Sequence, residues 1–470
     1  MLANEITPSL TLIYEASITQ GKIPSDWKNA YVTPPFKKGD RSKPSNYRPV
    51  SLTPICCKIL EHIKFSVVMK HLKTNNILTE SQHGFRKSLS CESQLLLTVE
   101  DLASSLSKNQ QVDAILLDFS KEFDKVPHQR LLAKFKYYGI RDNLNNWISD
   151  FLGERKQEVV LEGKHSTSSN VTSGVPQGTV LGPLLFLLFI NDMPENISST
   201  ARLFADDCLL YRTINSIEDA KELQKDLDTL QRWEQTWLME FNPDKCEVIN
   251  ITNKRSHVYH DYNIHGKILA HVTHAKYLGL TFSTNMTWNK HIDIITKKAN
   301  STCAFLRRNI SSCSKKVKAQ CYTTLVRPNV EYAATIWDPY TKQNIDKLEQ
   351  VQRRAARFVN GDYSTYSSVS KMIKDLNWPL LHQLRQNMKL IMMYRIVYNL
   401  IAIPSQVYLT PVITTTTRGH SMRFIVPHSR IKTHQYSFFP SAIRLWNTLP
   451  DTLVVLPTLE AFKAGIQLAE

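Results

Sequence analysis

Two adjacent aspartates, Asp206 and Asp207, stand inside an apolar segment that reads ARLFADDCLLYR. Successive side chains of a regular strand point to opposite faces, so both carboxylates reach one place only if the chain bends there. ARLF and CLLYR have the pattern of two short strands, which predicts a hairpin with the aspartates at its tip. Carboxylates in an apolar setting repel each other and lose hydration, and a divalent cation relieves both effects. The pair therefore predicts a Mg²⁺ site, although an isolated pair is more often a turn or a helix cap.

A third carboxylate has a comparable setting in VDAILLDFSKEFDKVPH, where Asp118 ends a buried strand and turn-forming residues follow. The segment SGVPQGTVLGPLLFLLFIND at 173–192 then places glycines and prolines in a loop that leads into an apolar helix. Such a loop lets the backbone approach a ligand closely. An ordinary tight turn before a buried helix gives the same pattern. Asp118 together with the aspartate pair is more specific than either feature alone.

The chain has 470 residues, of which 42% are hydrophobic, enough for the cores of two or three subdomains. Its first residues do not have the pattern of a signal peptide, which is a basic segment followed by an apolar one. Its longest apolar run is shorter than the roughly 20 residues of a membrane helix. We therefore expect a globular, intracellular protein without a membrane partner. The eight cysteines form no CxxC pair and have no close histidine, so we expect reduced thiols and no zinc site.

Positive charge is concentrated in the C-terminal part of the chain. The net charge is +16, of which residues 1–289 contribute +1 and residues 290–470 contribute +15. Basic clusters with interleaved aromatic residues are typical of proteins that bind the phosphate backbone of nucleic acids. For any single cluster, a solvated basic surface without a ligand is the alternative interpretation.

Three regions follow from the pattern of the sequence. The first, about 20–110, opens with a basic, loop-rich stretch, and the second, about 111–285, alternates short strands with helices. The third begins near residue 286 and is mainly helical, with a TTTTR surface loop at 414–418 and no predictable fold beyond residue 400. Apolar periodicity predicts helices over 95–106, 219–240 and 345–358. Strands and helices mixed in this way predict an α+β fold.

In their order and spacing, LLDFSKEFDKVPH, SGVPQGTVLGPLLFLLFIND and FADD resemble motifs A, B and C of reverse transcriptases of LINE-type (non-LTR) retrotransposons. The similarity extends to NYRPVSLTPICCKILEHI and SQHGFRKSLSCESQLL before them, and to FNPDKCEVI, KYLGLTF, LVRPNVEYAATIWDPY, LEQVQRRAARFV and FFPSAIRLWNTLPD after them. The resemblance implies a right-hand polymerase fold, with fingers, a palm with an antiparallel sheet and a helical thumb. It implies fingers and palm over 18–284, a basic thumb over 285–362 and a mostly helical basic C-terminal region of unknown role over 363–470.

By this resemblance, the chain is an RNA-directed DNA polymerase that extends a DNA primer on an RNA template with dNTPs. Asp118, Asp206 and Asp207 hold two Mg²⁺ ions, or Mn²⁺ in their place, about 4 Å apart. Lys245, in FNPDKCEVI, matches a lysine that acts as general acid toward the departing pyrophosphate.

The resemblance also assigns residues to the nucleotide and to the nucleic acid. Those assigned to the incoming nucleotide are Lys38, Arg48, Arg86, Phe119, Phe123, Gln177 and Gly178. Those assigned to the nucleic acid are Tyr277, Leu278 and Gly279 as a primer grip, and Arg353, Arg354 and Arg357 in the thumb. Phe123 matches the aromatic residue that excludes a ribose 2′-hydroxyl. Without the resemblance, the pattern favours a core aromatic at Phe123 and solvated charges at the basic positions.

Two positions depart from the family pattern. Glu122 replaces a small residue close to Asp118, where a further carboxylate competes for metal or repels the triphosphate. Pro35 follows another proline where the pattern expects a strand residue, and it removes a backbone donor. The chain also starts inside a fingers-like segment, so we expect a truncated copy without the upstream endonuclease domain. A relict that only binds nucleic acid is the alternative function, whereas the C-terminal segments argue against an intron-encoded maturase.

Overall fold

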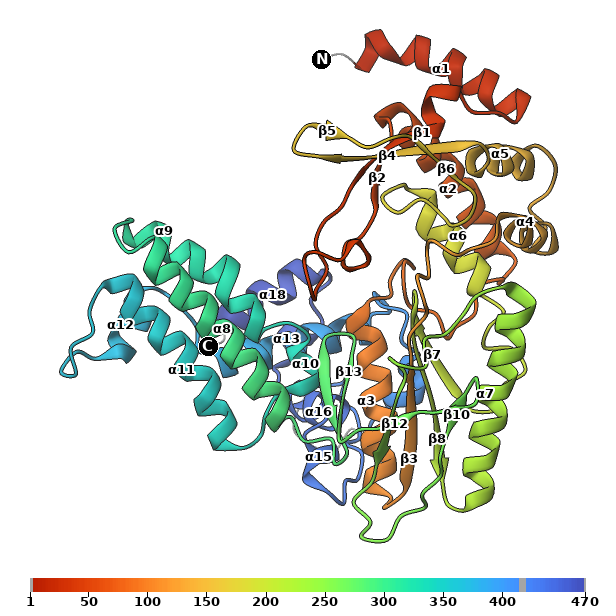
Figure 1. The fold of residues 1–470 in the computed structure, drawn as a ribbon. Coiled ribbons are helices and arrows are strands. Elements are labelled where there is room, and N and C mark those ends of the chain that lie inside the picture. Colours follow the sequence, from red (N-terminus) through yellow and green to blue (C-terminus); the bar gives the residue numbers. More distant parts are fainter. Residues whose placement is uncertain (1–2, 414–419, 469–470) are drawn as a thin grey trace.

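The fold is centred on a five-stranded sheet in the lower half of Figure 1, which we call the palm sheet. The computed structural model describes residues 3–413 and 420–468. The strand order is β12-β9-β3-β8-β7, and neighbouring strands are antiparallel except β12 and β9. The strands are β3 (Gln111–Leu117), β7 (Thr200–Phe204), β8 (Asp207–Ile214), β9 (Glu247–Ile251) and β12 (Ala270–His271). The predicted α+β fold with a mainly antiparallel palm sheet is confirmed.

Side chains of the palm sheet alternate between two hydrophobic cores. Val112 and Ala114 of β3 enter one core with helix α3 (Cys91–Ser107), while Ile115 and Leu117 enter the other. The second core also contains residues of α7 (Ile217–Trp237), which confirms the helix predicted over 219–240. Because both faces of the sheet are covered, the ends of β3, β7 and β8 are held in fixed positions.

A second sheet forms the fingers at the top of Figure 1. Its strands are β1 (Asn29–Thr33), β2 (Val50–Leu52), β4 (Arg155–Leu161), β5 (Lys164–His165) and β6 (Ser169–Val171). Its helices are α1 (Ala3–Gln20), α2 (Ile55–Thr74), α4 (His128–Tyr137), α5 (Asp142–Leu152) and α6 (Leu181–Ile190). The loop between β1 and β2 extends from this sheet toward the palm sheet (Figure 1).

Short hairpins and helices follow the palm sheet. The hairpins are β10 (Asn263–Ile264) with β11 (Lys267–Ile268), and β13 (His274–Tyr277) with β14 (Leu280–Ser283). The helices are α8 (Asn289–Asn309), α9 (Lys315–Cys321), α10 (Ala334–Trp337) and α11 (Lys342–Asn360). The apolar stripe predicted over 345–358 is buried in α11 through Leu348, Val351, Ala355 and Phe358.

The C-terminal helices contact one another and three earlier helices, namely the palm helix α3, α10 and α11. They are α12 (Val369–Asp375), α13 (Leu381–Val397), α14 (Ser405–Tyr408), α15 (Lys432–Gln435), α16 (Phe438–Asn447), α17 (Asp451–Val454) and α18 (Leu459–Leu468). Asp338 accepts from Arg385 Nε at 2.7 Å and pairs with Lys389 Nζ at 2.9 Å. Glu100 of α3 bonds to His434 at 3.2 Å and accepts from Ser437 Oγ at 3.1 Å. The sequence of α3 predicts an amphipathic helix with one exposed face. In the structure the C-terminal segment covers that face, so α3 is buried on nearly all sides.

No helix among residues 3–413 and 420–468 is long and apolar enough to cross a membrane. All eight cysteines are free. The threonine-rich loop predicted at 414–418 lies outside the described residues.

Candidate active site

The two adjacent aspartates lie at the tip of the β7–β8 hairpin. Phe204 pairs with Asp207 across the hairpin, which leaves Ala205 and Asp206 as the turn residues. Ala205 has a φ of +53°, a left-handed conformation that tightens the turn. The predicted hairpin is confirmed, and the bend places both carboxylates at the same end of the palm sheet.

Asp118 follows the last residue of β3, the strand that pairs with β8. Lys245 Nζ donates to Asp118 Oδ1 at 2.8 Å, and both side chains are about half exposed, at 48% and 46%. The backbone N–H of Asn242 donates to the carbonyl of Asp118 at 2.8 Å, which fixes the turn before β9 beside the end of β3. The predicted metal ligand and the predicted general acid are therefore in direct contact.

The carboxylates at this end of the sheet perturb one another. Loss of hydration raises the pKa of Asp206 to about 7, with Glu122 and Asp207 as the next causes. Loss of hydration also raises the pKa of Asp207, and the charges of Asp118 and Glu122 add to that rise. Four acidic side chains thus share one electrostatic neighbourhood, which is the arrangement that favours a bound cation. Glu122, the departure from the family pattern, belongs to this group.

The donor set of this cluster fits Mg²⁺ in its chemistry, since carboxylate oxygens are the hard ligands that this ion prefers. Among the described residues, no three His, Cys, Asp or Glu side chains converge closely enough to hold a metal by themselves. Mg²⁺ commonly uses one or two carboxylates and takes further ligands from water and substrate phosphates. The side chains present therefore suit an ion that arrives with a nucleotide better than a closed structural site.

The fingers loop brings positive charge to the aspartates. The charges of Lys37 and Arg48 lower the pKa of Asp207 and so oppose the rise caused by loss of hydration. The charge of Lys37 also lowers the pKa of Asp206. Lys38, the predicted residue, is exposed in the same loop. Phe36 pairs with Tyr47 across the loop, so neighbouring side chains alternate between its two faces. The carbonyl of Pro35 accepts from the N–H of Arg48 at 3.0 Å, which joins the two sides of this loop.

The glycine-rich loop over residues 173–179 lies between the fingers and the Asp118 segment. Val175 N–H donates to the Phe123 carbonyl at 2.7 Å. Ser51 N–H of β2 donates to the Gln177 carbonyl at 2.7 Å, and Gln177 Nε2 donates to Asp124 at 3.3 Å. Gly178 has a φ of +97°, and a Cβ there would lie 2.6 Å from the Ser51 carbonyl oxygen. We expected the backbone of this loop to approach a ligand closely; in the structure the close neighbour of Gly178 is strand β2.

The two phenylalanines assigned to the nucleotide have different surroundings. Phe123 is partly buried, and its ring stacks on Phe186 of α6 with 4.5 Å between ring centroids. Phe119 is only 3% exposed and stacks on Phe241 at 4.4 Å. Its ring belongs to the core, so the structure does not bring that side chain to the carboxylates. Arg86 is likewise engaged elsewhere, because Nη1 donates to the carbonyls of Thr79 and Gln82 at 2.6 and 3.2 Å.

The predicted primer grip is the two-residue turn of the β13–β14 hairpin. Tyr277 pairs with Leu280, and the turn residues Leu278 and Gly279 have φ values of +43° and +87°. Positive φ at both central residues is typical of a type I′ hairpin turn. Tyr277 is buried, while Tyr332 Oη donates to the Leu278 carbonyl at 3.0 Å and its ring lies over Gly279. The accessible part of this turn therefore consists of exposed Gly279, partly exposed Leu278 and the neighbouring Tyr332.

The three thumb arginines are on α11 outside its apolar stripe, as predicted. Arg354 is exposed, and Arg353 and Arg357 are partly buried. Arg357 Nη1 donates to the Ser364 carbonyl at 2.7 Å, so it also stabilises the end of its own helix. Arg354 is the most accessible of the three to a phosphate.

Comparison with known proteins identifies the family of this site. The family model described as reverse transcriptase (RNA-dependent DNA polymerase) matches residues 36–282, more than half of the chain. The chain belongs to the reverse transcriptase family. The match includes the palm strands, the glycine-rich loop and the β13–β14 hairpin, and it carries the right-hand polymerase fold with it. Reverse transcriptases as a family use divalent metal ions.

The relatives of this reverse transcriptase are proteins of mobile elements. A probable RNA-directed DNA polymerase from transposon BS of Drosophila melanogaster is 29% identical over 388 residues, covering 78% of this chain and 42% of that protein. The RNA-directed DNA polymerase from mobile element jockey of the same species is 28% identical over 402 residues, covering 82% and 43%. The chain therefore spans about two-fifths of the length of these curated relatives. The resemblance to LINE-type reverse transcriptases is confirmed.

Among solved structures, apo telomerase from Candida tropicalis is similar, with a TM-score of 0.43 and 11% sequence identity. The similarity covers 79% of this chain and 64% of that chain.

Sequence reasoning missed a residue that holds the aspartate turn of this reverse transcriptase. Gln82 is 2% exposed, and its Oε1 accepts from the N–H groups of Ala205 and Gly84 at 2.8 and 2.7 Å. Its Nε2 donates to the Ala205 carbonyl at 3.3 Å. Gly84 lies so close that a Cβ would be 2.4 Å from the Ala205 nitrogen. The resemblance to the family includes the QHGFR segment, but it does not predict that Gln82 bonds to Ala205, which lies 123 positions away in the sequence.

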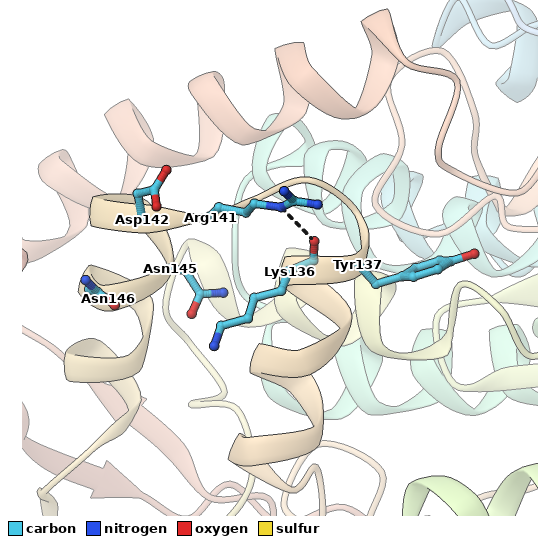
Figure 2. A pocket seen from close by; sticks show the side chains of 6 residues that line it. All are labelled: Lys136, Tyr137, Arg141, Asp142, Asn145 and Asn146. Atoms are coloured by element: carbon cyan, nitrogen blue, oxygen red, sulfur yellow. Dashed lines mark hydrogen bonds between the residues drawn. The ribbon is translucent and has the colours of Figure 1, made fainter.

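A separate cavity of about 600 Å³ lies between α4 and α5 in the fingers (Figure 2). Its lining consists of Lys136, Tyr137, Arg141, Asp142, Asn145 and Asn146. None of these residues belongs to the carboxylate cluster or to the glycine-rich loop. The residues of the reverse transcriptase motifs therefore lie outside this hollow, at one end of the palm sheet.

Proposed function

We propose that the chain is an RNA-directed DNA polymerase that extends a DNA primer on an RNA template. The observation that carries this proposal is the meeting of Asp118, Asp206 and Asp207 at one end of the palm sheet, beside the glycine-rich loop. Family membership supports the same reaction. RNA template, DNA primer and dNTPs are the proposed partners, and the proposed activity is intracellular.

Together with water and substrate phosphates, the three aspartates would hold two Mg²⁺ ions, and the charge of Glu122 acts on the same carboxylates. Bound Mg²⁺ supplies positive charge that favours the ionised primer hydroxyl and stabilises charge on the leaving pyrophosphate. The contribution of the protein is to fix the aspartates on rigid strand ends, which is positioning and electrostatic preorganisation. Gln82 supports this by holding the turn that carries Asp206.

Four basic side chains would balance the charge of the triphosphate and supply a proton to the leaving group. Lys37 and Arg48 extend from the fingers loop toward the aspartates and would neutralise the triphosphate, with exposed Lys38 in the same loop. Lys245 would give its proton to the pyrophosphate after leaving Asp118, its partner in the free protein. Because that pair is half exposed, the ion pair is weak and its exchange costs little.

Positioning of the nucleotide and the primer follows from the same geometry. Phe123 would lie against the sugar and exclude a 2′-hydroxyl, while Gln177 and Gly178 would contact the base pair from the glycine-rich loop. The Leu278–Gly279 turn with Tyr332 would support the primer end. We assign fingers and palm to residues 18–284, the thumb to 285–362 and a C-terminal region that buttresses α3 to 363–470.

Primer extension on poly(rA)/oligo(dT) with Mg²⁺ and dTTP tests this function. We expect extension by the wild-type chain and none by Asp206→Asn. Salt-sensitive RNA binding without any extension would reject the polymerase in favour of a protein that only binds nucleic acid.

A further inference from the structure

A buried carboxylate from the fingers holds the start of helix α6. Glu61 of α2 is fully buried, and its Oε2 accepts from the N–H groups of Val180 and Leu181 at 2.8 and 2.9 Å. Cys57 Sγ donates to the other oxygen at 3.5 Å. Burial raises the pKa of Glu61, and the two backbone N–H groups oppose that rise. The first free N–H groups of α6 are thus satisfied by a residue 119 positions away.

Helix α6 has no side-chain cap of its own, since Val180 precedes it. Thr179 links the loop to the helix, because its hydroxyl donates to the Pro176 carbonyl at 2.9 Å and accepts from Gly182 N–H at 3.0 Å. These bonds join neighbouring residues and do not fix the helix relative to the fingers. Glu61 provides that connection from α2, and Ser51 provides a second one at Gln177.

The position of α6 sets the position of Phe123. Phe186 lies on α6 and is completely buried, and its ring stacks on Phe123 at 4.5 Å with 20° between the ring planes. The Phe123 carbonyl also accepts from Val175 in the loop before α6. A shift of the α6 start therefore moves the surface against which Phe123 packs.

We propose that Glu61 is a positioning residue for sugar selection, which acts through α6 and Phe186 on Phe123. This inference rests on the proposed polymerase function, because it concerns the choice between deoxyribonucleotides and ribonucleotides. Glu61 is fully buried, and its hydrogen bonds go to Cys57, Val180 and Leu181 and not to the carboxylate cluster. Its removal releases α6, and Phe123 then yields to a 2′-hydroxyl.

A purely structural role for Glu61 predicts lower stability without a change in nucleotide choice. Asp226 of α7 provides the matched control, since it is 4% exposed and accepts from Ser198 and Ser199 N–H at 2.9 and 2.8 Å. It has the same kind of bonds, but they go to Ser198 and Ser199 and not to α6 or the glycine-rich loop. Asp226→Asn should therefore weaken the fold and leave selectivity unchanged.

The test compares kcat/KM for dTTP and UTP on poly(rA)/oligo(dT). We expect Glu61→Ala to lower the dTTP to UTP ratio at least tenfold, Glu61→Gln to restore most of it, and Asp226→Asn to keep the wild-type ratio. An unchanged ratio in active Glu61→Ala overturns the proposal. If Glu61→Ala does not fold, Phe186→Leu removes the stacking surface directly and should lower the ratio as well; an unchanged ratio there overturns the proposal too.

Hydrogen exchange separates this inference from the proposed function. In the peptide over 178–186, Glu61→Ala should exchange faster than wild type, whereas Asp226→Asn should not. Unchanged protection in Glu61→Ala overturns the anchoring role whether or not the chain polymerises. A wild-type chain that incorporates neither nucleotide refutes the polymerase function and with it the selection of sugars, while lost protection would still support the anchoring of α6.

Discussion

Gly178→Ala is the substitution whose effect follows most directly from the coordinates. Gly178 has a φ of +97°, and a Cβ there would lie 2.6 Å from the Ser51 carbonyl oxygen and 3.2 Å from Val50 Cγ1. A non-glycine residue in such a conformation costs about 1–3 kcal/mol. Crowding against a backbone carbonyl, which no rotamer change relieves, adds about 1–3 kcal/mol. We therefore expect the variant to lose at least about 2 kcal/mol of stability.

The loop can avoid part of this cost by moving away from β2, which displaces Gln177 from the nucleotide. We expect a KM for dTTP at least tenfold higher and a lower urea midpoint. Gly163→Ala is the control, because its φ of +77° is also left-handed but no atom lies within 4 Å of the added Cβ. It should cost about 1 kcal/mol and leave KM unchanged. If both variants have the same KM and stability, the close packing of the loop on β2 is not what positions Gln177.

Three further predictions concern charge. Glu122→Ala should move the acidic limb of the pH–rate profile to lower pH, since Glu122 helps to raise the pKa of Asp206 to about 7; an unmoved limb would separate Glu122 from the site. Burial lowers the pKa of His83 from 6.5 to about 4, so between these values only the unfolded chain binds the proton and stability falls as pH decreases. Urea unfolding at pH 6.5 and 5 gives the loss of stability between these pH values, and His83→Gln should make it smaller by up to about 1.4 kcal/mol per pH unit. The same loss in wild type and His83→Gln would contradict this prediction. Arg353→Gln with Arg354→Gln should flatten the log–log salt dependence of RNA binding by up to about 2, whereas an unchanged slope would place both outside the interface.

The strand ends and the hairpin tip follow from local sequence, because alternation and turn chemistry act over a few residues. Asp206 and Asp207 could be placed at a bend without knowledge of their partners, and so could Asp118 at the end of a strand. The helices over α7 and α11 followed from their apolar stripes in the same way.

The contacts that hold the site could not be predicted, because they join distant segments. Gln82 bonds to Ala205 across 123 positions, and Glu61 bonds to Val180 across 119. The covered face of α3 depends on His434, more than 300 positions away. The charge of Lys37, and not of Lys38, lowers the pKa of Asp206, because successive side chains of the fingers loop point to opposite faces. The glycines and prolines of this segment predict an irregular loop, so this alternation could not be predicted from the sequence. Phe119 has the same difficulty, since only the packing with Phe241 shows that its ring is buried.

The most direct test of the account is incorporation of a single dTMP by the purified chain on an RNA-templated DNA primer. Asp118→Asn removes one charge of the carboxylate cluster. Asp244→Asn is the control, because Asp244 is next to Lys245 in the sequence but forms its ion pair with Lys267. We predict Mg²⁺-dependent incorporation by the wild type and Asp244→Asn, and a loss of at least 100-fold in Asp118→Asn, on the order expected for a group that positions the reacting charges. Equal incorporation by Asp118→Asn and Asp244→Asn would contradict the assignment of the reaction to this end of the palm sheet.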